Sequence, residues 1–416
     1  MTDSENSDYT QQPIPPLRLD LEPIPVESEG EQILILRDPN GYSERVLSLS
    51  LQAWTLMLAF DGALNATQLS DRIFKADAVR LPAEQIAGLA DLLDNAGFLR
   101  NQRYEALRAR EDAAFAKLTV RPAVHAGQSY PSQAPELKAF FHELFADAPV
   151  LPDKVPIGIL APHIDLKIGP HVYVPAYASL RDAEPDTVIV LGTSHYSSED
   201  LFLLTGKHFE TPLGVARCDT ELLALLREKT GNEFTARDAA HKREHSIEFQ
   251  ILFLQHVFRE RMPRILPVLC TSFEYTLDAG GPQADPRYRR FVSGFREALA
   301  ASGRRVAYVV SVDWSHFGRK FGDTEDAAAM LDSVRASDAQ QLDALARLDY
   351  PDFVAQLRAT MNGTRIDGFS CISTFLDIAM PDRAALLAYD VWHEEERASA
   401  VSFAAMSFWR DADGIC

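Results

Sequence analysis

The chain has 416 residues, 46% of them hydrophobic, which is enough for two ordinary domain cores. Its formal net charge of −19 argues against nucleic-acid or anionic-membrane binding, because neither partner would be attracted to an acidic protein. Four widely spaced cysteines without a CxxC pair exclude a disulfide framework and a zinc site of four thiolates, and they fit a reducing compartment.

The N-terminal sequence MTDSENSDYTQQPIPP has neither the basic region nor the apolar stretch of a signal peptide. No run approaches the roughly 18 to 20 apolar residues that span a bilayer. We therefore expect a cytoplasmic protein. Residues 1–18 are polar, acidic and proline-bearing, and we expect a disordered tail because such a segment buries too little apolar surface to offset its ordering entropy.

Residues 19–103 predict a small accessory domain. The phrase ILILRDPNGYSERVLSLS predicts two strands joined by a turn at residues 38–41. Helical patterns follow at residues 51–60, 66–74 and 82–96, with Ser50 and Thr67 as expected N-caps and Pro82 expected in a first turn. Residues 104–119 form a charged pattern that predicts a linker helix.

The phrase LSLQAWTLMLAFDGALNATQLSDRIF, followed later by LLDNAGFL, resembles the winged-helix-like domains of the PqqD group. Those domains bind peptides and accompany radical-SAM peptide-maturation enzymes. The resemblance implies a small winged-helix-like α+β domain with a peptide ligand. A generic helical accessory domain is the alternative interpretation.

Residues 120–416 predict a second domain, in which three apolar runs each end just before a histidine. The runs are residues 157–160 before His163, 188–191 before His195, and 306–312 before His316. Their β-branched composition is typical of buried parallel strands, and ligands bind at the carboxyl ends of such strands. Because neutral imidazole is the commonest metal ligand, the three histidines together predict one metal site.

The rest of this domain predicts a helix at residues 134–145 and a closing strand at residues 400–409. Five phrases in order resemble the Memo family, which includes the bacterial proteins called AmmeMemoRadiSam system protein B: IGILAPHIDLKIGPHVYVPAYASL, VIVLGTSHYSSEDLFLL, FETPLGVARCD, HKREHSIEFQILFL and VVSVDWSHFG. The resemblance covers residues 120–409. It implies an α/β fold with a central sheet and helices on both faces, similar to the class III extradiol dioxygenases, which use non-haem iron(II).

By this resemblance His163 and His195 are the first two metal ligands, and His316 corresponds to the catalytic base of the dioxygenases. The family's third ligand is a cysteine in an Ile-Cys-Gly phrase, whereas this chain has Ile366-Asp367-Gly368. We therefore expect Asp367 as the third ligand and Cys371 as a small buried residue. A turn residue before Gly368 is the alternative role of Asp367.

Two histidines and one carboxylate form the facial arrangement of iron(II) oxygenases, which leaves positions open for substrate and dioxygen. Iron(II) is therefore the expected cofactor, with copper or zinc as alternatives.

His245 and Glu248 are three residues apart on a predicted helix and share a face, and the resemblance places them near the site. We expect these two residues to contact substrate or to support the ligands. Asp313 beside His316 could fix the tautomer of that ring or bind substrate, or it could cap a turn. Residues 241–245 also match the H-x-x-E-H helix of a zinc protease, which is a third, weaker interpretation.

These features predict a metal-dependent redox enzyme that acts on a small molecule or a peptide. The catalytic residues would be His316, His245 and Asp313, and the metal ligands would be His163, His195 and Asp367. The alternative is a non-catalytic partner or scaffold of a radical-SAM-associated system. The resemblance gives radical-SAM and AMMECR-type proteins as candidate partners.

Overall fold

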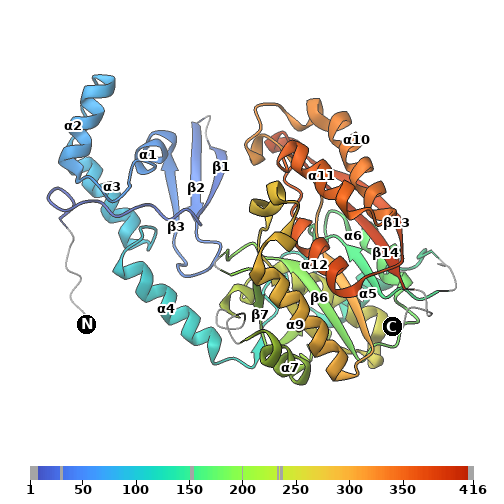
Figure 1. Ribbon diagram of the computed structural model, residues 1–416. Coiled ribbons are helices and arrows are strands. Elements are labelled where there is room, and N and C mark those ends of the chain that lie inside the picture. The colour runs from blue at the N-terminus through green and yellow to red at the C-terminus, as the bar shows by residue number, and fades with distance from the viewer. Residues whose placement is uncertain are drawn as a thin grey trace. The chain divides into compact units, whose positions relative to one another are not determined.

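The computed structural model describes residues 8–28, 31–149, 154–198, 200–231, 234 and 238–410 (Figure 1). The chain divides into two compact units, Met1–Lys117 and Leu118–Cys416. In the described residues no helix has both the length and the apolar character needed to cross a membrane.

The N-terminal unit combines a three-stranded antiparallel sheet with four helices. Its elements are β1 (Glu22–Ser28), β2 (Glu31–Arg37), β3 (Val46–Ser50), α1 (Leu51–Met57), α2 (Ala66–Asp77), α3 (Ala83–Asn95) and α4 (Gln102–Ala116). The two predicted strands are β2 and β3. Strand β1 was not predicted because Pro23 and Pro25 argue against a strand, but β1 is an edge strand, where a missing N–H is tolerated.

Polar side chains cap the first turns of helices α1 and α2. Ser50 caps α1 as predicted, since its side chain accepts the N–H of Ala53. The prediction of Thr67 as a cap was wrong, because Asn65 caps α2 and its side chain accepts the N–H of Gln68.

The tail expected at residues 1–18 is a misprediction for residues 8–18, which pack onto the N-terminal unit; residues 1–7 lie outside the described residues. Tyr9 and Ile14 are buried in the core of the unit. Arg18 is buried as well, because its guanidinium pairs with Asp38 at 3.0 Å and lies 4.3 Å from the ring centroid of Tyr104. These few well-placed side chains order a segment of polar composition. Through Tyr104, the helix expected as a linker belongs to this unit from its first turn.

The C-terminal unit is built on an eight-stranded sheet in the described part of the chain, in the order β12-β14-β5-β11-β6-β10-β7 with β13 paired to β14. The strands are β5 (Gly158–Ala161), β6 (Thr187–Thr193), β7 (Phe202–Leu204), β10 (Arg264–Cys270), β11 (Val306–Ser311), β12 (His316–Gly318), β13 (Arg383–Glu394) and β14 (Ser399–Trp409). Strands β5, β11, β6 and β10 run parallel, so their carboxyl ends meet at one edge. The predicted histidine-bearing strands and the predicted closing strand are all present, as β5, β6, β11 and β14.

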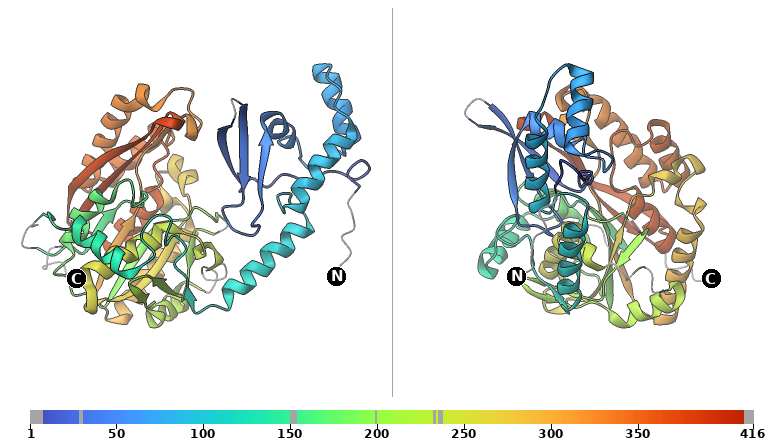
Figure 2. Two further views of the ribbon diagram at one scale, coloured as in Figure 1. Left: turned by 180° about the vertical axis from the view of Figure 1, so that it is seen from behind. Right: turned by 90° about the vertical axis from the view of Figure 1, so that its left-hand side faces the viewer.

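Helices cover both faces of this sheet, as predicted (Figures 1 and 2). Ile189 and Leu191 of β6 pack on one face with α7, α9, α11 and α12, whereas Val188 and Val190 pack on the other face with α5, α6 and α8. The helices are α5 (Ala134–Leu144), α6 (Pro170–Ser179), α7 (Thr220–Thr230), α8 (His245–Phe258), α9 (Pro286–Ser302), α10 (Ala327–Ala346), α11 (Tyr350–Thr360) and α12 (Phe369–Ala379). A small second sheet contains β4 (Val120–Arg121), β8 (His208–Thr211) and β9 (Gly214–Ala216).

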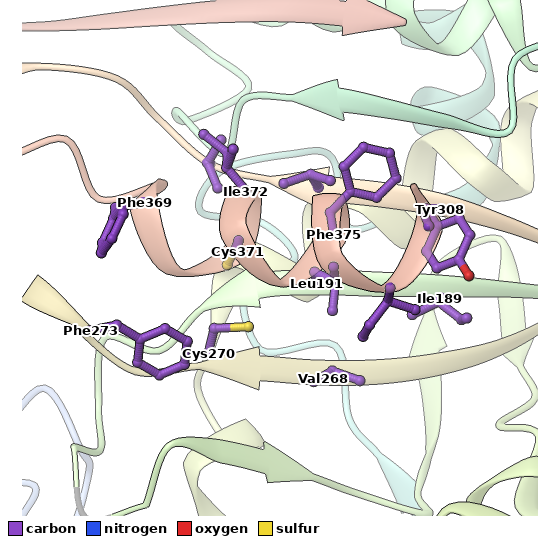
Figure 3. Packing of buried hydrophobic residues seen from close by; sticks show 14 of the residues in the cluster. Ile189, Leu191, Val268, Cys270, Phe273, Tyr308, Phe369, Cys371, Ile372 and Phe375 are labelled. Carbon is purple, nitrogen blue, oxygen red and sulfur yellow. The ribbon is translucent and has the colours of Figure 1, made fainter. Parts of the chain in front are cut away.

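Helix α12 is anchored on the sheet by apolar side chains (Figure 3). Ile372 and Phe375 on α12 belong to the same buried cluster as Leu191 of β6 and Tyr308 of β11. Each fully buried side chain of this size contributes roughly 1.5 to 3 kcal/mol. The segment just before α12, which carries Asp367, is therefore held against the carboxyl ends of the strands.

Candidate metal centre

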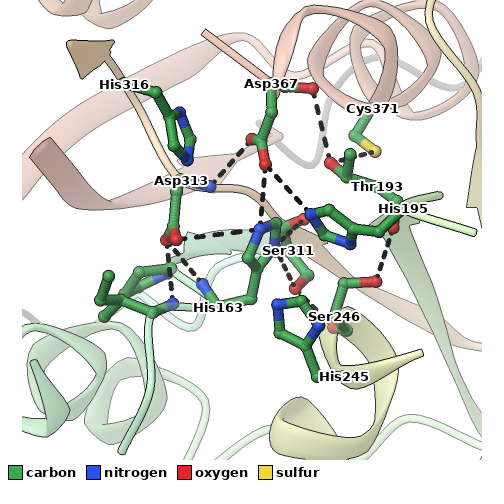
Figure 4. Close-up of polar contacts among 12 residues, drawn as sticks. His163, Thr193, His195, His245, Ser246, Ser311, Asp313, His316, Asp367 and Cys371 are labelled. Carbon is green, nitrogen blue, oxygen red and sulfur yellow. Dashed lines mark hydrogen bonds and ion pairs between the residues drawn. The ribbon is translucent and has the colours of Figure 1, made fainter. Parts of the chain in front are cut away.

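Three adjacent parallel strands deliver side chains to one place. Strand β11 lies between β5 and β6, and Ser311 is in register with Ala161 on one side and Gly192 on the other. His163, His195 and Asp313 follow these aligned positions by two or three residues. Figure 4 shows that their side chains converge, so the structure brings together the histidines that the strand pattern pointed to.

Asp367 reaches the same place from the segment between α11 and α12. Its Oδ1 accepts the main-chain N–H of Asp313 at 3.1 Å. Its Oδ2 lies 2.9 Å from Nε2 of His163 and 3.8 Å from Nε2 of His195. This oxygen is buried, and among the residues that the structure describes it has no hydrogen-bond partner. One carboxylate oxygen and two imidazole nitrogens thus face a common point.

The backbone around Asp367 fits closely against the end of β11. A Cβ atom on Gly368 would lie 2.8 Å from Cβ of Val312, closer than such atoms approach in proteins. Ile366 on the other side is buried. The phrase Ile366-Asp367-Gly368 therefore positions the carboxylate through packing, which also accounts for the glycine.

His163 is almost fully buried, with 2% of its side chain exposed. Its Nδ1 lies 3.2 Å from the carbonyl oxygen of Ser311, and a carbonyl can only accept, so in the neutral ring Nδ1 carries the proton and Nε2 is left as the donor atom. Burial lowers the pKa of His163, but the carboxylates of Asp313 and Asp367 outweigh it and the net shift is upward.

His195 is oriented by Glu244, which in the sequence is the glutamate of the H-x-x-E-H match and was not predicted as a residue of this site. Glu244 is fully buried and accepts two hydrogen bonds from His195, from the main-chain N–H at 2.9 Å and from Nδ1 at 2.8 Å. Burial alone would lower the pKa of His195, but Glu244 and Asp367 raise it to about 10. The contact leaves Nε2 of His195 facing Asp367. Glu244 directly precedes His245, and this position is the signal that could have identified it.

His245 is the first residue of α8 and stacks on His195, with ring centroids 4.6 Å apart and an interplanar angle of 25°. Its centroid is 5.2 Å from that of His163. Ring nitrogens of His163, His195 and His245 lie within 4.8 Å of one another, a grouping that could hold a metal ion. Burial and the neighbouring His195 hold the pKa of His245 well below its usual value, so the ring is neutral.

The zinc-protease interpretation was wrong, because residues 241–245 do not form one helix. His241 ends a short 3-10 helix, η2 (Asp238–His241), and His245 begins α8. Nε2 of His241 lies 2.9 Å from the carbonyl oxygen of Leu203. The spacing of four residues therefore does not place both imidazoles on a shared helical face.

His316, at the start of β12, carries its proton on Nδ1. This atom lies 3.1 Å from the carbonyl oxygen of Trp314 and 3.0 Å from that of Arg365, and both oxygens can only accept. Nε2 is therefore the basic nitrogen of the neutral ring. Figure 4 places His316 beside Asp313 and Asp367.

Asp313 does not fix the tautomer of His316, because two carbonyl oxygens have that role. Its Oδ1 instead accepts the main-chain N–H groups of His163 and Ile164, at 2.9 and 3.0 Å. Its Oδ2 lies 3.8 Å from Nε2 of His163. Burial raises the pKa of Asp313 above its ordinary value. Asp313 thus shapes the turn that carries His163.

Two buried carboxylates hold the surrounding segments. Asp338 of α10 accepts the hydroxyl of Ser315 at 2.6 Å and thereby fixes the loop that leads to His316. Glu248 accepts the hydroxyl of Tyr130 and the main-chain N–H of His125 and pairs with Arg121, so it ties residues 121–130 to α8. The supporting role expected for Glu248 is therefore a structural one.

Cys371 is buried on α12, with its Sγ 3.8 Å from Oγ1 of Thr193. Figure 4 shows this sulfur in contact with Thr193 and with no imidazole ring. Cys371 is thus a small buried residue, as predicted.

Comparisons with known proteins point to one family. The sequence pattern of the family described as Memo-like protein matches residues 121–407. A MEMO1 family protein of Aquifex aeolicus is 31% identical over 379 residues, which are 90% of this chain and 96% of that protein. A MEMO1 family protein of Thermus thermophilus is 28% identical over 335 residues, or 80% of this chain and 96% of that protein. The Aquifex match is longer than the C-terminal unit and so includes part of the N-terminal unit.

Proposed function

Because this chain belongs to the Memo-like protein family, we propose that its C-terminal unit is a metal-dependent redox enzyme. The proposed metal is a divalent ion, with iron(II) as the first candidate, and its proposed ligands are His163, His195 and Asp367. The observation that carries the proposal is the position of Asp367 Oδ2, which is buried, lacks a hydrogen bond and lies 2.9 and 3.8 Å from the two imidazole nitrogens.

The donor set fits such an ion. A buried carboxylate oxygen without a hydrogen bond is costly unless a cation balances it. In the metal-free protein His195, with a pKa of about 10, is that cation, and a bound metal ion would take the place of its proton. Each imidazole uses Nδ1 for a fixed contact, His163 with Ser311 and His195 with Glu244, and turns Nε2 toward the carboxylate. Metal-ligating histidines typically have this arrangement, since the second nitrogen sets the tautomer and orientation. A carboxylate in place of a thiolate favours iron(II) over copper(I) or zinc.

When bound, iron(II) would supply open coordination positions and redox chemistry. His316 would hold or move the substrate proton at Nε2, because its Nδ1 proton is committed to two carbonyl oxygens. Asp313 would keep His163 in place through its bonds to the main chain. The substrate class is a small molecule or a peptide, and a cytoplasmic location and radical-SAM or AMMECR-type partners are parts of the same proposal.

For the N-terminal unit we propose a winged-helix-like accessory role with a peptide ligand. Its three-stranded sheet and four helices are compatible with the small α+β domain that the PqqD-like phrase implies. The alternative for the whole protein is a non-catalytic scaffold in a radical-SAM-associated system, which differs in that it needs no open metal site.

Metal analysis after anaerobic purification tests the proposal. Near-stoichiometric iron and binding of nitric oxide are expected for the wild-type chain, because only an ion with an open position accepts that ligand. His163→Ala should lose the metal, while His171→Gln, a change at an exposed histidine paired with Asp390, should keep it. Metal-free wild-type protein that does not take up iron(II) would favour the scaffold.

A further inference from the structure

We infer that His245 is a fourth protein ligand of the metal, so that the site presents three imidazoles and one carboxylate. This inference rests on the proposed metal binding. It adds a donor to the set His163, His195 and Asp367, and it changes how many coordination positions remain for other molecules.

His245 has a fixed position at the start of its helix. It begins α8, and the next residue, Ser246, ties that helix start to the sheet, because its hydroxyl donates to the carbonyl oxygen of Thr193 at 2.8 Å. The hydroxyl of Ser311 donates to the main-chain oxygen of Ser246. The ring of His245 is therefore held at the ends of both β6 and β11, the strands that lead to His195 and Asp313.

In the described part of the chain neither ring nitrogen of His245 makes a hydrogen bond, and Nδ1 lies 3.5 Å from Oε1 of Glu244. Other histidines near this helix are committed: Nε2 of His125 lies 2.9 Å from the carbonyl oxygen of Arg243, and Nε2 of His241 lies 2.9 Å from that of Leu203. His245 is thus the histidine whose nitrogens remain available beside the proposed ligands.

A ring nitrogen of His245 lies within 4.8 Å of the ring nitrogens of both His163 and His195, and Asp367 Oδ2 lies within 3.8 Å of both. Figure 4 shows Asp367 and His245 on opposite sides of that histidine pair. The three imidazoles are therefore close enough to share one ion, and Asp367, which lies outside this grouping, would complete the set by moving toward that ion.

A site with three imidazoles selects a class of metal. Imidazole suits first-row transition ions, whereas magnesium and calcium take oxygen ligands. We expect iron(II), cobalt(II) or manganese(II) to bind, and magnesium and calcium to leave the site empty. A six-coordinate ion with four protein donors keeps two positions for other molecules, where a facial triad keeps three.

Cobalt(II) titration of the full-length protein, followed by visible absorption, tests the inference because the spectrum responds to the number and type of inner ligands. His245→Gln and His245→Asn are compared with wild type, with His171→Gln as the matched loss of a histidine outside the site. We expect the two His245 variants to bind cobalt more than about 100-fold more weakly, beyond the roughly 10- to 100-fold effect of outer partners, and to show a changed spectrum. His171→Gln should match wild type.

A spectrum in both His245 variants that superimposes on that of wild type would overturn the inference, whatever the affinity, because His245 would then lie outside the inner sphere. Wild-type protein that binds no cobalt would instead overturn the proposed metal site itself. The two failures are therefore distinguishable in one experiment.

Discussion

Asp367 stands where the phrase that this chain resembles has a cysteine. Its Oδ1 is satisfied by the main chain of Asp313, and its Oδ2 is left facing His163 and His195. Cys371, four residues on, is packed into the core instead. The sequence allowed this distinction, because the position of the aspartate in the Ile-Asp-Gly phrase matched the ligand position of the resembling family.

The residue-scale prediction is a ranking of three variants. Asp367→Ala should weaken iron(II) binding strongly, Asp367→Cys should shift preference toward softer ions such as copper(I) or zinc, and Cys371→Ser should do neither. Metal content and iron(II) affinity of the three proteins, measured side by side, provide the check. The opposite ranking, with Cys371→Ser losing metal and Asp367→Ala keeping it, would mean a thiolate site.

A second prediction concerns proton release by His195. Its pKa of about 10 in the metal-free protein means that the ring is protonated at pH 7 and must lose a proton to bind a metal. Iron(II) affinity should therefore rise with pH up to about 10, and about one proton should be released per metal from this ring. In Glu244→Gln the pKa of His195 falls, so fewer protons should be released at pH 7. Calorimetry in two buffers of different ionisation enthalpy counts these protons, and equal counts in both proteins would contradict the role given to Glu244.

At the scale of elements, the parallel strands β5, β6 and β11 could be predicted because each is a short apolar run just before a histidine, whereas the parallel strand β10 was not predicted. Strand β1 could not be predicted, because its two prolines are typical of loops. They are tolerated here because β1 lies at the edge of its sheet. Glu244 and Asp338 were missed for another reason. Their partners, His195 and Ser315, lie 49 and 23 residues away in the sequence, so no local pattern links them.

The close approach of the Asp367 segment to β11 yields an element-scale prediction. Gly368→Ala should destabilise the C-terminal unit by about 1 to 3 kcal/mol, as overpacking does, and should weaken metal binding by moving Asp367. Gly88→Ala is the matched control, because Gly88 lies in α3 with no atom within 4 Å of the added Cβ, and it should be neutral or stabilising by about 0.5 to 1 kcal/mol. Denaturant unfolding of the two variants measures the difference, and equal stabilities would contradict the packing argument.

At the scale of the whole molecule, the fold class followed from the resemblance to the Memo family and from the apolar runs that predicted buried parallel strands. The division near residue 118 agrees with the predicted boundary between the linker helix and the second domain. The order of residues 8–18 did not follow, because polar composition gave no sign of the Arg18 ion pairs that hold this segment. A protein lacking residues 1–117 should stay folded and bind its metal, since every proposed ligand lies beyond residue 118. Circular dichroism and metal content of the truncated chain test this, and loss of either would show that the units depend on one another.

Acid stability is a further whole-molecule property. His241 is fully buried, and burial lowers its pKa to about 4. In the unfolded chain the pKa of this histidine is about 6.5, so the unfolded state takes up a proton first as the pH falls. The free energy of unfolding should therefore decrease by up to about 3 kcal/mol between about pH 6.5 and pH 4, and the neutral His241 ring makes its full contribution to stability above pH 6.5. His241→Gln keeps a donor toward Leu203 without titrating. In the metal-free state, the free energy of unfolding of the His241→Gln variant should depend less on pH across this range than that of the wild-type protein. An equal pH dependence in both proteins would contradict the lowered pKa of His241.

The location of the metal is the central claim, and anomalous scattering tests it most directly. Crystals of the full-length protein grown anaerobically with iron(II) should give a single strong peak at the iron absorption edge, within bonding distance of His163 Nε2, His195 Nε2 and Asp367 Oδ2. The absence of a peak there in protein shown to contain iron, or a peak elsewhere in the molecule that none of these three residues binds, would contradict the account.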